Sequence, residues 1–552
     1  MIKFSQKPNS SSTEKLLTSG YYKSINGIFL GGLQTIWGLV LLPRIMPYPE
    51  VFGIIATVGV IINLIGILID WGVWTAIDVK LAAAYGSQNM EEVEKYVRTV
   101  IGFKIINGLI FNLIIDLFLI LIFPIMNLDY KNAYYIYFFL IAIRWFGGFA
   151  VISERILLAN QRFDYEFYYQ TINFLFLVSS RIFWFYTCNK IYPKEPIIAF
   201  TIAIAISETI ETFFNWFTQA MFLRRAKLLK FSRVLKPQLN KEVLSYIFHY
   251  GKFVMSRQYL LLFSEVNSTL WVFLVRLMFQ NPESIIGIWS FALGSMGPFF
   301  MAGNLTAPIL PAISDAYHRK DWNLIQEYWI TAFNWFCLWS ICALGMFIRY
   351  AELIVVVVSG PTWRLAGVVC MLISPAFLFK LGNELLYNIL YGSDYPKGVL
   401  ISTCIKIPIL LVGGLLLFKN LVLMSVVFFI IEFSAFLNNY RLVKKRLKIQ
   451  SPKKSYIIPI ISSIITLLIL EGLNYLLIFD ESVKSLVLVY GSYLVIFFIV
   501  FILLGGFEEK DFDQFKGSLN QIFRKGKMAE RTINLLKKIA QKSPFYINFE
   551  KK

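Results

Sequence analysis

Three observations predict that this chain is an all-helical, polytopic membrane protein. The 552 residues are 57% hydrophobic and only 16% charged, and the mean hydropathy of +0.62 is well above that of soluble domains. Apolar stretches recur along most of the chain, and basic residues gather in alternate loops between them. The stretches are predicted as helices because each has 18 or more residues, whereas a membrane barrel needs strands of about ten that alternate in polarity.

Fourteen stretches are long enough to cross a hydrocarbon core of roughly 30 Å as helices. They cover residues 25–43, 51–77, 99–126, 133–158, 167–189, 196–222, 249–277, 285–310, 325–349, 364–390, 397–417, 421–440, 456–478 and 485–506. This order predicts a cytoplasmic N-terminal segment (1–24), a lobe of six spans (25–223), a basic linker (224–248), a second lobe of six spans (249–447), an extra helix pair (456–506) and a basic tail (507–552).

The distribution of Lys and Arg predicts that both termini lie in the cytoplasm. With this orientation the cytoplasmic segments hold about 37 of the 53 basic residues and the outer segments about 8. The net charge of +19 follows from that asymmetry, and we expect no nucleic-acid partner because the basic residues are dispersed over one membrane face. The N-terminal segment lacks the apolar core of a cleaved signal peptide, so the first span is expected to be an uncleaved anchor.

Two segments of nearly the same sequence indicate an internal repeat. AYGSQNMEEVEKY begins at Ala84 and AYHRKDWNLIQEY begins at Ala316, 232 residues later. Pro49-Glu50 precedes the first copy by about 35 residues and Pro282-Glu283 precedes the second by about 34, with a long apolar run between in both cases. Since the copies are separated by an even number of spans, both halves would enter the membrane from the same side, as in transporters built from parallel repeats. The alternative is a chance likeness between two short amphipathic loop helices.

Several stretches resemble one family of membrane transporters. They are PEVFGIIATVGVIINLIGILIDWGVWTAI with the following LAAAYGSQNMEEVEKY, ILLANQRFDYEF (156–167), APILPAISDAYHRKDW (307–322) and NILYGSDYPKG (388–398). Together they are similar to Wzx-type polysaccharide flippases of the multidrug/oligosaccharidyl-lipid/polysaccharide exporter superfamily. The extra pair at 456–506 departs from the commonest twelve-span form, and related lipid II flippases also have fourteen spans.

The resemblance implies a two-lobed exporter in the cell membrane, used in polysaccharide biosynthesis. Its substrate would be a lipid-linked oligosaccharide, moved from the inner to the outer leaflet by alternating access. The implied partners are this substrate, membrane lipid and a coupling ion, H⁺ or Na⁺. No cofactor or metal is expected, since the five cysteines have no CxxC spacing and the chain has only two histidines.

Such a substrate carries phosphate, so basic residues within the spans are candidate ligands. A basic side chain near the centre of a membrane helix costs about 2.5 to 3.5 kcal/mol, which makes each one a functional candidate. Three of the eight, Lys104, Lys252 and Arg276, lie near span ends, where a long side chain can reach the interface. Lys380 has Glu384 one turn later and is expected to pair with it.

The four remaining basic residues are predicted to bind phosphate: Arg257, Arg144, Arg181 and Lys406. Arg257 is the first choice, because it lies on the span that opens the second lobe and its planar guanidinium can hold phosphate oxygens with two bonds. The alternative for Arg257 is an ion pair with Glu265 or with a carboxylate on another helix.

Carboxylates within the spans are candidates for ion coupling. Glu208 and Glu211 are three residues apart and share one face of a helix, so one of them could carry a proton or both could hold Na⁺. Glu265 is a third candidate. The alternative for Glu208 and Glu211 is an ion pair with Arg144 or Arg181 in the same lobe.

The sequence leaves two further functions to weigh against a flippase. A cation-coupled multidrug exporter of the same superfamily would favour an acidic or aromatic cavity over basic side chains within the spans. An integral membrane glycosyltransferase or polymerase would need a sizeable loop or domain with catalytic groups, whereas the outer loops here are short. We therefore expect a transporter that is not an enzyme.

Overall fold

The computed structural model describes most, but not all, of the chain. The described residues are 29–30, 33–34, 36–70, 73, 77, 80–81, 84, 89–125, 130–145, 150–159, 163–226, 236–265, 268–296, 309, 313, 316–317, 320–393, 395–450, 453–477, 481–507, 537 and 541. Some side chains within these ranges, including those of Arg144 and Arg257, lie outside the description.

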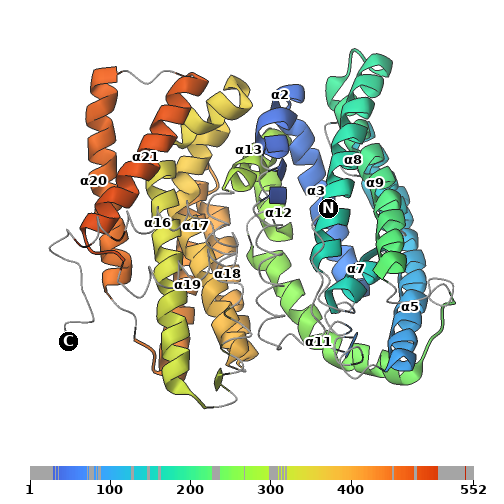
Figure 1. The fold of residues 1–552 in the computed structure, drawn as a ribbon. Helices are drawn as coiled ribbons and strands as arrows, with labels where there is room; N and C mark the ends of the chain where they lie inside the picture. The colour runs from blue at the N-terminus through green and yellow to red at the C-terminus, as the bar shows by residue number, and fades with distance from the viewer. Residues whose placement is uncertain are drawn as a thin grey trace. The chain divides into compact units, whose positions relative to one another are not determined.

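In these residues the chain forms helices and no strands (Figure 1). The α-helices are Leu42–Ile45 (α2), Pro49–Asp70 (α3), Met90–Leu117 (α5), Lys131–Trp145 (α6), Ala150–Ala159 (α7), Phe163–Ile191 (α8), Pro196–Ala226 (α9), Lys241–Ser264 (α11), Thr269–Met278 (α12), Pro282–Ser295 (α13), Trp322–Ser359 (α16), Arg364–Gly392 (α17), Pro396–Leu417 (α18), Leu421–Leu447 (α19), Lys454–Leu477 (α20) and Val483–Leu503 (α21). The predicted all-α fold is confirmed.

Ten helical segments of the described chain are long and apolar enough to cross a membrane. They correspond to the predicted spans except 25–43, 133–158, 167–189 and 285–310. Three of these four contain helix that is interrupted by residues outside the description, and the fourth, α8, carries polar residues such as Gln170 and Arg181 among its apolar ones. The protein is therefore a multi-pass membrane protein.

Local sequence signals fix many helix ends. Proline, whose missing N–H is not needed in the first helical turn, begins α3, α9, α13 and α18. Asn240, Asn420 and Ser482 are N-caps whose side-chain oxygens accept bonds from backbone N–H groups of α11, α19 and α21. Lys448 ends α19 in the left-handed conformation, with φ of 53°.

The described residues at the helix start of the two repeat copies have the same local structure. Asn89 and Asp321 hold the same position in the two copies, and both are N-caps, with φ and ψ of −84° and 84° in one and −87° and 86° in the other. Each side chain accepts a bond from the backbone N–H three residues later, at 3.2 and 3.0 Å. Their own N–H groups donate to the carbonyls of Ala84 and Ala316, at 2.9 and 3.0 Å. The repeat is thus a repeated helix start and not only a repeated composition.

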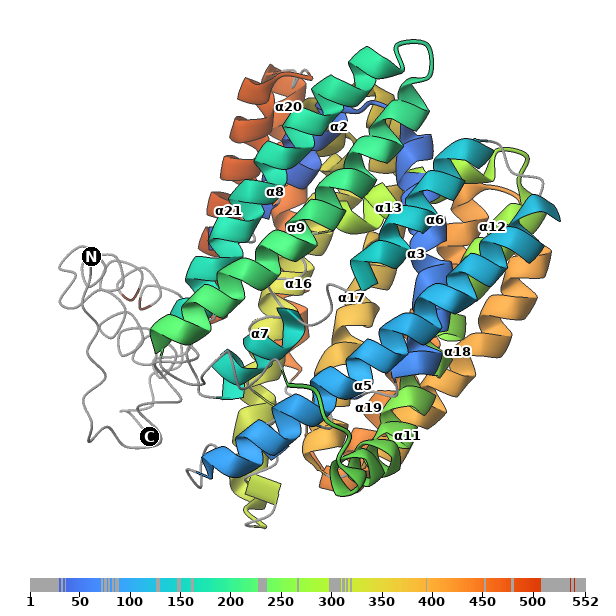
Figure 2. The ribbon, with the colours of Figure 1, turned by 90° about the vertical axis from the view of Figure 1, so that its right-hand side faces the viewer.

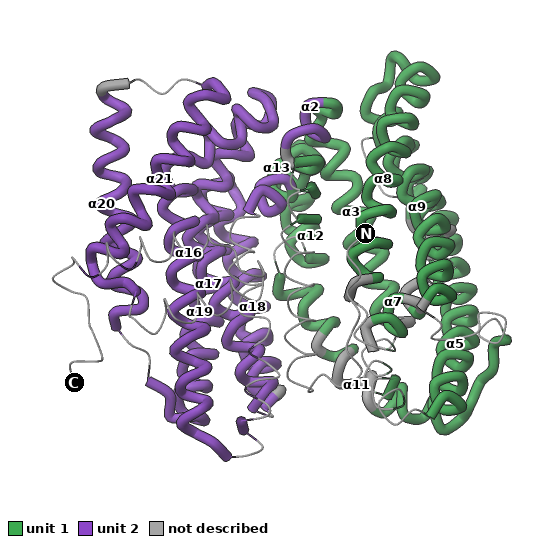
Figure 3. Tube along the Cα trace, viewed as in Figure 1, with its two compact units in different colours: residues 1–38, 45–290 green, residues 39–44, 291–552 purple. Residues whose placement is uncertain are grey.

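The chain forms two compact units (Figure 3). Unit 1 contains residues 1–38 and 45–290, and unit 2 contains 39–44 and 291–552. The helices between residues 241 and 290 therefore belong to unit 1, whereas the sequence analysis assigned residues 249–447 to a second lobe. The predicted division into lobes of residues 25–223 and 249–447 stays a prediction.

Unit 1 is built on close pairs of helices. The long helices α8 and α9 run side by side (Figure 2), and α6 and α7 pack against α9. A buried apolar cluster joins α5, α7 and α11 through residues such as Val97, Val100, Ile156 and Ile247. At the ends of α5 and α11, Lys95 donates to Glu242 and holds the pKa of the Glu242 carboxyl below its usual value.

Unit 2 holds the extra helix pair against α16. A Cβ built on Gly345 of α16 would lie 1.9 Å from the Ser463 hydroxyl of α20 and 2.3 Å from the Tyr493 hydroxyl of α21. These two hydroxyls lie 3.1 Å apart in a buried hydrogen bond. Only glycine leaves room for this bond against the α16 backbone, so α20 and α21 are an integral part of unit 2.

Polar contacts also join α16 and α17 to α20 and to the segments that precede α20 and α21. The Gln326 side chain donates to the Gln450 carbonyl at 2.7 Å, and Gln450 N–H donates to the Gln326 side chain at 3.0 Å. Further contacts join Asn334 with Ser455, Arg349 with Glu471, and Arg364 with Glu481.

We expect Gly345→Ala to destabilise unit 2, because its methyl group would displace the Ser463–Tyr493 hydrogen bond. An overpacked buried site typically costs about 1 to 3 kcal/mol, which a lower unfolding temperature of the purified protein would reveal. The matched control is Gly472→Ala on α20, where a Cβ meets nothing within 4 Å. Adding Ser463→Ala should recover part of the loss. Equal unfolding temperatures for Gly345→Ala and Gly472→Ala would contradict this account.

Candidate functional site

The span predicted at 249–277 is two helices. It breaks after Ser264, where α11 ends, and resumes at Thr269, where α12 begins. Glu265 at the end of α11 has an extended backbone, with φ of −93° and ψ of 153°. The side-chain hydroxyls of Ser264 and Ser268 are buried and have no hydrogen-bond partner in the described residues. A break within a membrane span is tolerated only where protein or a water-filled cavity surrounds it, so broken spans commonly mark transport sites.

Two tryptophans pack next to this break. Trp271 of α12 and Trp289 of α13 are fully buried, with ring centroids 4.8 Å apart and planes at 42°. They fix the position of α12 after the break.

One predicted cation of unit 1 is paired within the helix bundle. Arg181 Nη2 lies 2.7 Å from Glu208 Oε1, and Tyr137 OH donates to Glu208 Oε2 at 3.3 Å. Arg181 lies ten residues before the end of α8, and the side chains of Arg181 and Glu208 are 14% and 16% exposed. The sequence left open whether Glu208 pairs with Arg181, and the structure has this pair.

The Arg181 guanidinium is only partly engaged. Its Nη2 holds Glu208, while its Nε is buried without a hydrogen-bond partner among the described residues. Guanidinium offers five N–H donors, so Arg181 can hold further acceptor oxygens besides one carboxylate oxygen. Glu211 lies one turn after Glu208 on α9 and is partly buried.

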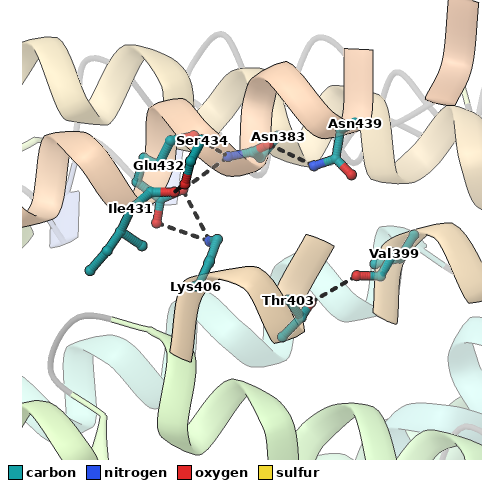
Figure 4. A network of polar contacts seen from close by, with 8 residues as sticks. All are labelled: Asn383, Val399, Thr403, Lys406, Ile431, Glu432, Ser434 and Asn439. Atoms are coloured by element: carbon teal, nitrogen blue, oxygen red, sulfur yellow. Dashed lines mark hydrogen bonds and ion pairs between the residues drawn. The ribbon is translucent and has the colours of Figure 1, made fainter. Parts of the chain in front are cut away.

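Unit 2 contains a second buried ion pair, shown in Figure 4. Lys406 Nζ of α18 lies 3.0 Å from both carboxylate oxygens of Glu432 on α19, and the two side chains are 2% and 0% exposed. Asn383 of α17 donates to the Glu432 carboxylate and to its backbone carbonyl, both at 3.0 Å. Asn439 donates to Asn383 at 2.7 Å and accepts from the Ser402 hydroxyl. The network ties α17, α18 and α19 together.

Sequence reasoning missed Glu432 and Asn383 as partners of Lys406. It sought an opposite charge one turn away on the same helix, whereas Glu432 is 26 residues away on the next one. The available signal was Glu432 itself, because a carboxylate within an apolar span needs a neighbouring cation or donor.

The other predicted site residues are placed only in part. The backbones of Arg144 and Arg257 lie on α6 and α11, and their side chains lie outside the described structure. Glu265 ends α11 at the break. Of the four predicted phosphate ligands, the structure thus describes the side chains of Arg181 in unit 1 and Lys406 in unit 2, each beside a glutamate. No cluster of three or more potential metal ligands occurs among the described residues.

We expect Lys406→Met to destabilise the protein by about 3 to 5 kcal/mol, because it leaves the Glu432 carboxylate buried without the ammonium. The double change Lys406→Met with Glu432→Leu should restore most of the loss, measured by thermal unfolding in detergent. If Lys406 also binds phosphate, the double variant would unfold normally and still fail to transport. A single variant as stable as the parent would contradict the structural role of the pair.

No family model and no curated protein sequence matches the chain. Its structure is similar to that of the lipid II flippase MurJ in an inward closed conformation, with a TM-score of 0.61 and 15% identity over 88% of this chain and 97% of that one. It is also similar to an inward-facing multidrug resistance MATE family transporter of the MOP superfamily, with a TM-score of 0.56 and 12% identity over 78% of this chain and 95% of that one. The eukaryotic MATE transporter AtDTX14 matches with a TM-score of 0.50 and 14% identity, covering 79% and 99%.

At these identities the likeness concerns the fold. It agrees with the superfamily expected from the sequence and does not single out the Wzx-type flippases within it. The chain has the fold of the MOP superfamily transporters.

Proposed function

We propose that the protein is a flippase that moves a polyprenyl-(pyro)phosphate-linked oligosaccharide from the inner to the outer leaflet of the plasma membrane by alternating access. The observation that carries the proposal is the Arg181–Glu208 pair: a guanidinium far from the helix ends, partly exposed, bonded to Glu208 through one nitrogen. A charged side chain so far from the ends of a membrane helix is energetically costly, so it is expected to serve function or structure.

A phosphate group of the substrate could replace the Glu208 carboxylate at the Arg181 guanidinium. A pyrophosphate presents several acceptor oxygens and about two negative charges, and the planar Arg181 fork can hold two of the oxygens. Glu208, displaced from Arg181, keeps the Tyr137 hydroxyl as a donor. Substrate bound at Arg181 would compete with Glu208 for the guanidinium, so substrate binding and the binding of a coupling ion at Glu208 would be linked. Glu211 and Glu265 remain further proposals for ion coupling, and Arg144, Arg257 and Lys406 for phosphate binding.

The extra helix pair supports a flippase. The lipid II flippase covers 88% of this chain, whereas the MATE transporters cover 78% and 79%. The difference is about a tenth of the chain, which is the size of the segment from α20 to α21. An interior-negative membrane potential would also favour outward movement of the anionic substrate, by about 2.3 kcal/mol per charge per 100 mV.

The second candidate is a cation-coupled multidrug exporter, favoured by the fold likeness to MATE transporters. It would need carboxylates available to a cationic drug. Three carboxylates of the described spans, Glu208, Glu283 and Glu432, each lie beside a basic side chain, which leaves fewer carboxylates for such a drug.

We expect both termini to be cytoplasmic. A single cysteine in place of Lys236 should then react with a thiol reagent only after the membrane is permeabilised, and one in place of Lys419 should react in intact cells, both in a cysteine-free background. The prediction rests on the excess of basic residues in the loops assigned to the inside. Labelling of residue 236 in intact cells would reverse the orientation.

We expect Arg181→Ala to lower flipping of a fluorescent polyprenyl pyrophosphate sugar in proteoliposomes by at least about tenfold, the loss of roughly one charge-assisted bond. Arg181→Lys keeps the charge and should retain partial activity. Glu208→Gln should flip substrate but lose its response to a proton gradient. The control is Arg349→Ala, which removes an exposed partner of Glu471.

Stability separates a transport role from a structural one. If Arg181 only neutralises Glu208, the double variant Arg181→Ala with Glu208→Gln should regain both stability and transport. If Arg181 binds the substrate, the double variant should regain stability but not transport. Full transport by a folded Arg181→Ala protein would remove the residue from the site, and drug efflux without lipid flipping would favour the multidrug exporter.

A further inference from the structure

Helix α3 and the first part of α13, both in unit 1, touch backbone to backbone at a pair of glycines. A Cβ built on Gly53 of α3 would lie 2.0 Å from the carbonyl oxygen of Glu283 in α13. A Cβ built on Gly287 of α13 would lie 1.8 Å from the carbonyl oxygen of Pro49 in α3. Real Cβ atoms do not approach oxygen so closely, so any side chain at either position would push the two helices apart.

The contact is reciprocal and joins the two halves of the internal repeat. Pro49-Glu50 begins α3 and Pro282-Glu283 begins α13, and each precedes its copy of the repeated segment. In each helix, a carbonyl of the first turn meets a glycine of the partner. Small residues in such positions let membrane helices approach until Cα–H groups contact carbonyl oxygens. We call this contact, formed by Pro49, Gly53, Glu283 and Gly287, the glycine seam.

A buried polar cluster lies beside the glycine seam. Arg276 Nη2 of α12 lies 3.1 Å from Glu283 Oε1 and 3.3 Å from the Thr57 hydroxyl of α3. It also donates to the Tyr134 hydroxyl of α6, which in turn donates to Glu283 at 3.2 Å. Glu283, Tyr134 and Thr57 are each at most 3% exposed. Arg276, which the sequence places near a span end, binds these groups from α3, α6 and α13.

The hydrogen bonds of the Arg276 cluster depend on the close approach of α3 and α13 at the glycine seam. The starts of α3, α6 and α13 and the end of α12 meet here, as they should if these ends lie at one membrane face. The buried Glu283 carboxylate and the partly buried Arg276 guanidinium neutralise each other while the helices are in contact, and water could solvate both charges if the helices separated. Separation of the helices would therefore exchange paired charges for hydrated ones.

We propose that the glycine seam and the Arg276 cluster close one face of the transporter and separate once in each transport cycle. In the orientation proposed above, this is the outer face. Gly53 and Gly287 set how tightly the seam closes, and Tyr134 and Glu283 hold Arg276 in the closed state. The inference rests on the proposed alternating access, but it does not depend on the identity of the substrate.

The test measures how fast a membrane-impermeant maleimide labels a buried position from outside. Val51, fully buried in the first turn of α3, is replaced by cysteine in a cysteine-free background. Gly53→Ala and Gly287→Ala should each speed labelling by roughly five- to a hundredfold, the shift expected from one overpacked contact. The controls are Gly59→Ala and Gly294→Ala, on the same two helices, where a Cβ meets nothing within 4 Å. They should label as slowly as the parent.

A second pair of variants keeps the test decisive if the glycine variants fold poorly. Tyr134→Phe removes the hydroxyl that joins Arg276 and Glu283 while keeping the ring, and it should also speed labelling. Its control is Tyr135→Phe, the neighbouring and half-exposed tyrosine. Equal labelling in the glycine variants and their controls, or rapid labelling of the parent, would overturn the proposal. Failure of lipid flipping with the labelling pattern intact would instead reject the substrate.

Discussion

A charge within an apolar helix bundle is tolerated only beside a partner, and this constraint organises both units. Arg181, Arg276 and Lys406 each meet a glutamate from a different helix. Each pair specifies which helices are neighbours, because a shift of one helix would leave two charges unpaired in a poorly hydrated place. The pairs differ in exposure. Lys406 and Glu432 are fully enclosed, as a structural pair should be, whereas Arg181 and Glu208 keep some access and an incompletely used guanidinium.

The sequence predicted the all-α fold because a helix needs about twenty apolar residues to cross the hydrocarbon core, and stretches of that length are easily recognised. It also predicted the repeat, whose two N-caps Asn89 and Asp321 have the same geometry. It did not predict the break between α11 and α12, although residues 264–269 (SEVNST) are mostly polar, because the long apolar runs on both sides dominate the hydropathy of the whole span. Pairs such as Lys406 with Glu432 were missed because helical spacing identifies neighbours on one helix only.

Glycine positions in these helices have two distinct roles that the sequence does not separate. Gly59 and Gly294 face open space, while Gly53, Gly287 and Gly345 lie against backbone or hydroxyl atoms of another helix. Their sequence contexts are equally apolar, so only the structure shows where close approach is needed. The contacts of these three glycines occur where a repeat helix meets its counterpart and where the extra helix pair meets α16.

The extra helix pair is attached to unit 2 in two chemically different ways. In its middle, Gly345 holds a buried hydrogen bond between Ser463 and Tyr493. Toward one end, Arg349 with Glu471 and Arg364 with Glu481 are about half exposed. Exposed ion pairs weaken as dissolved salt screens them, whereas the buried contact does not. Opening of α20 and α21 should therefore begin at the end with the ion pairs and become more frequent at high ionic strength, with amide hydrogens near Gly345 exchanging last.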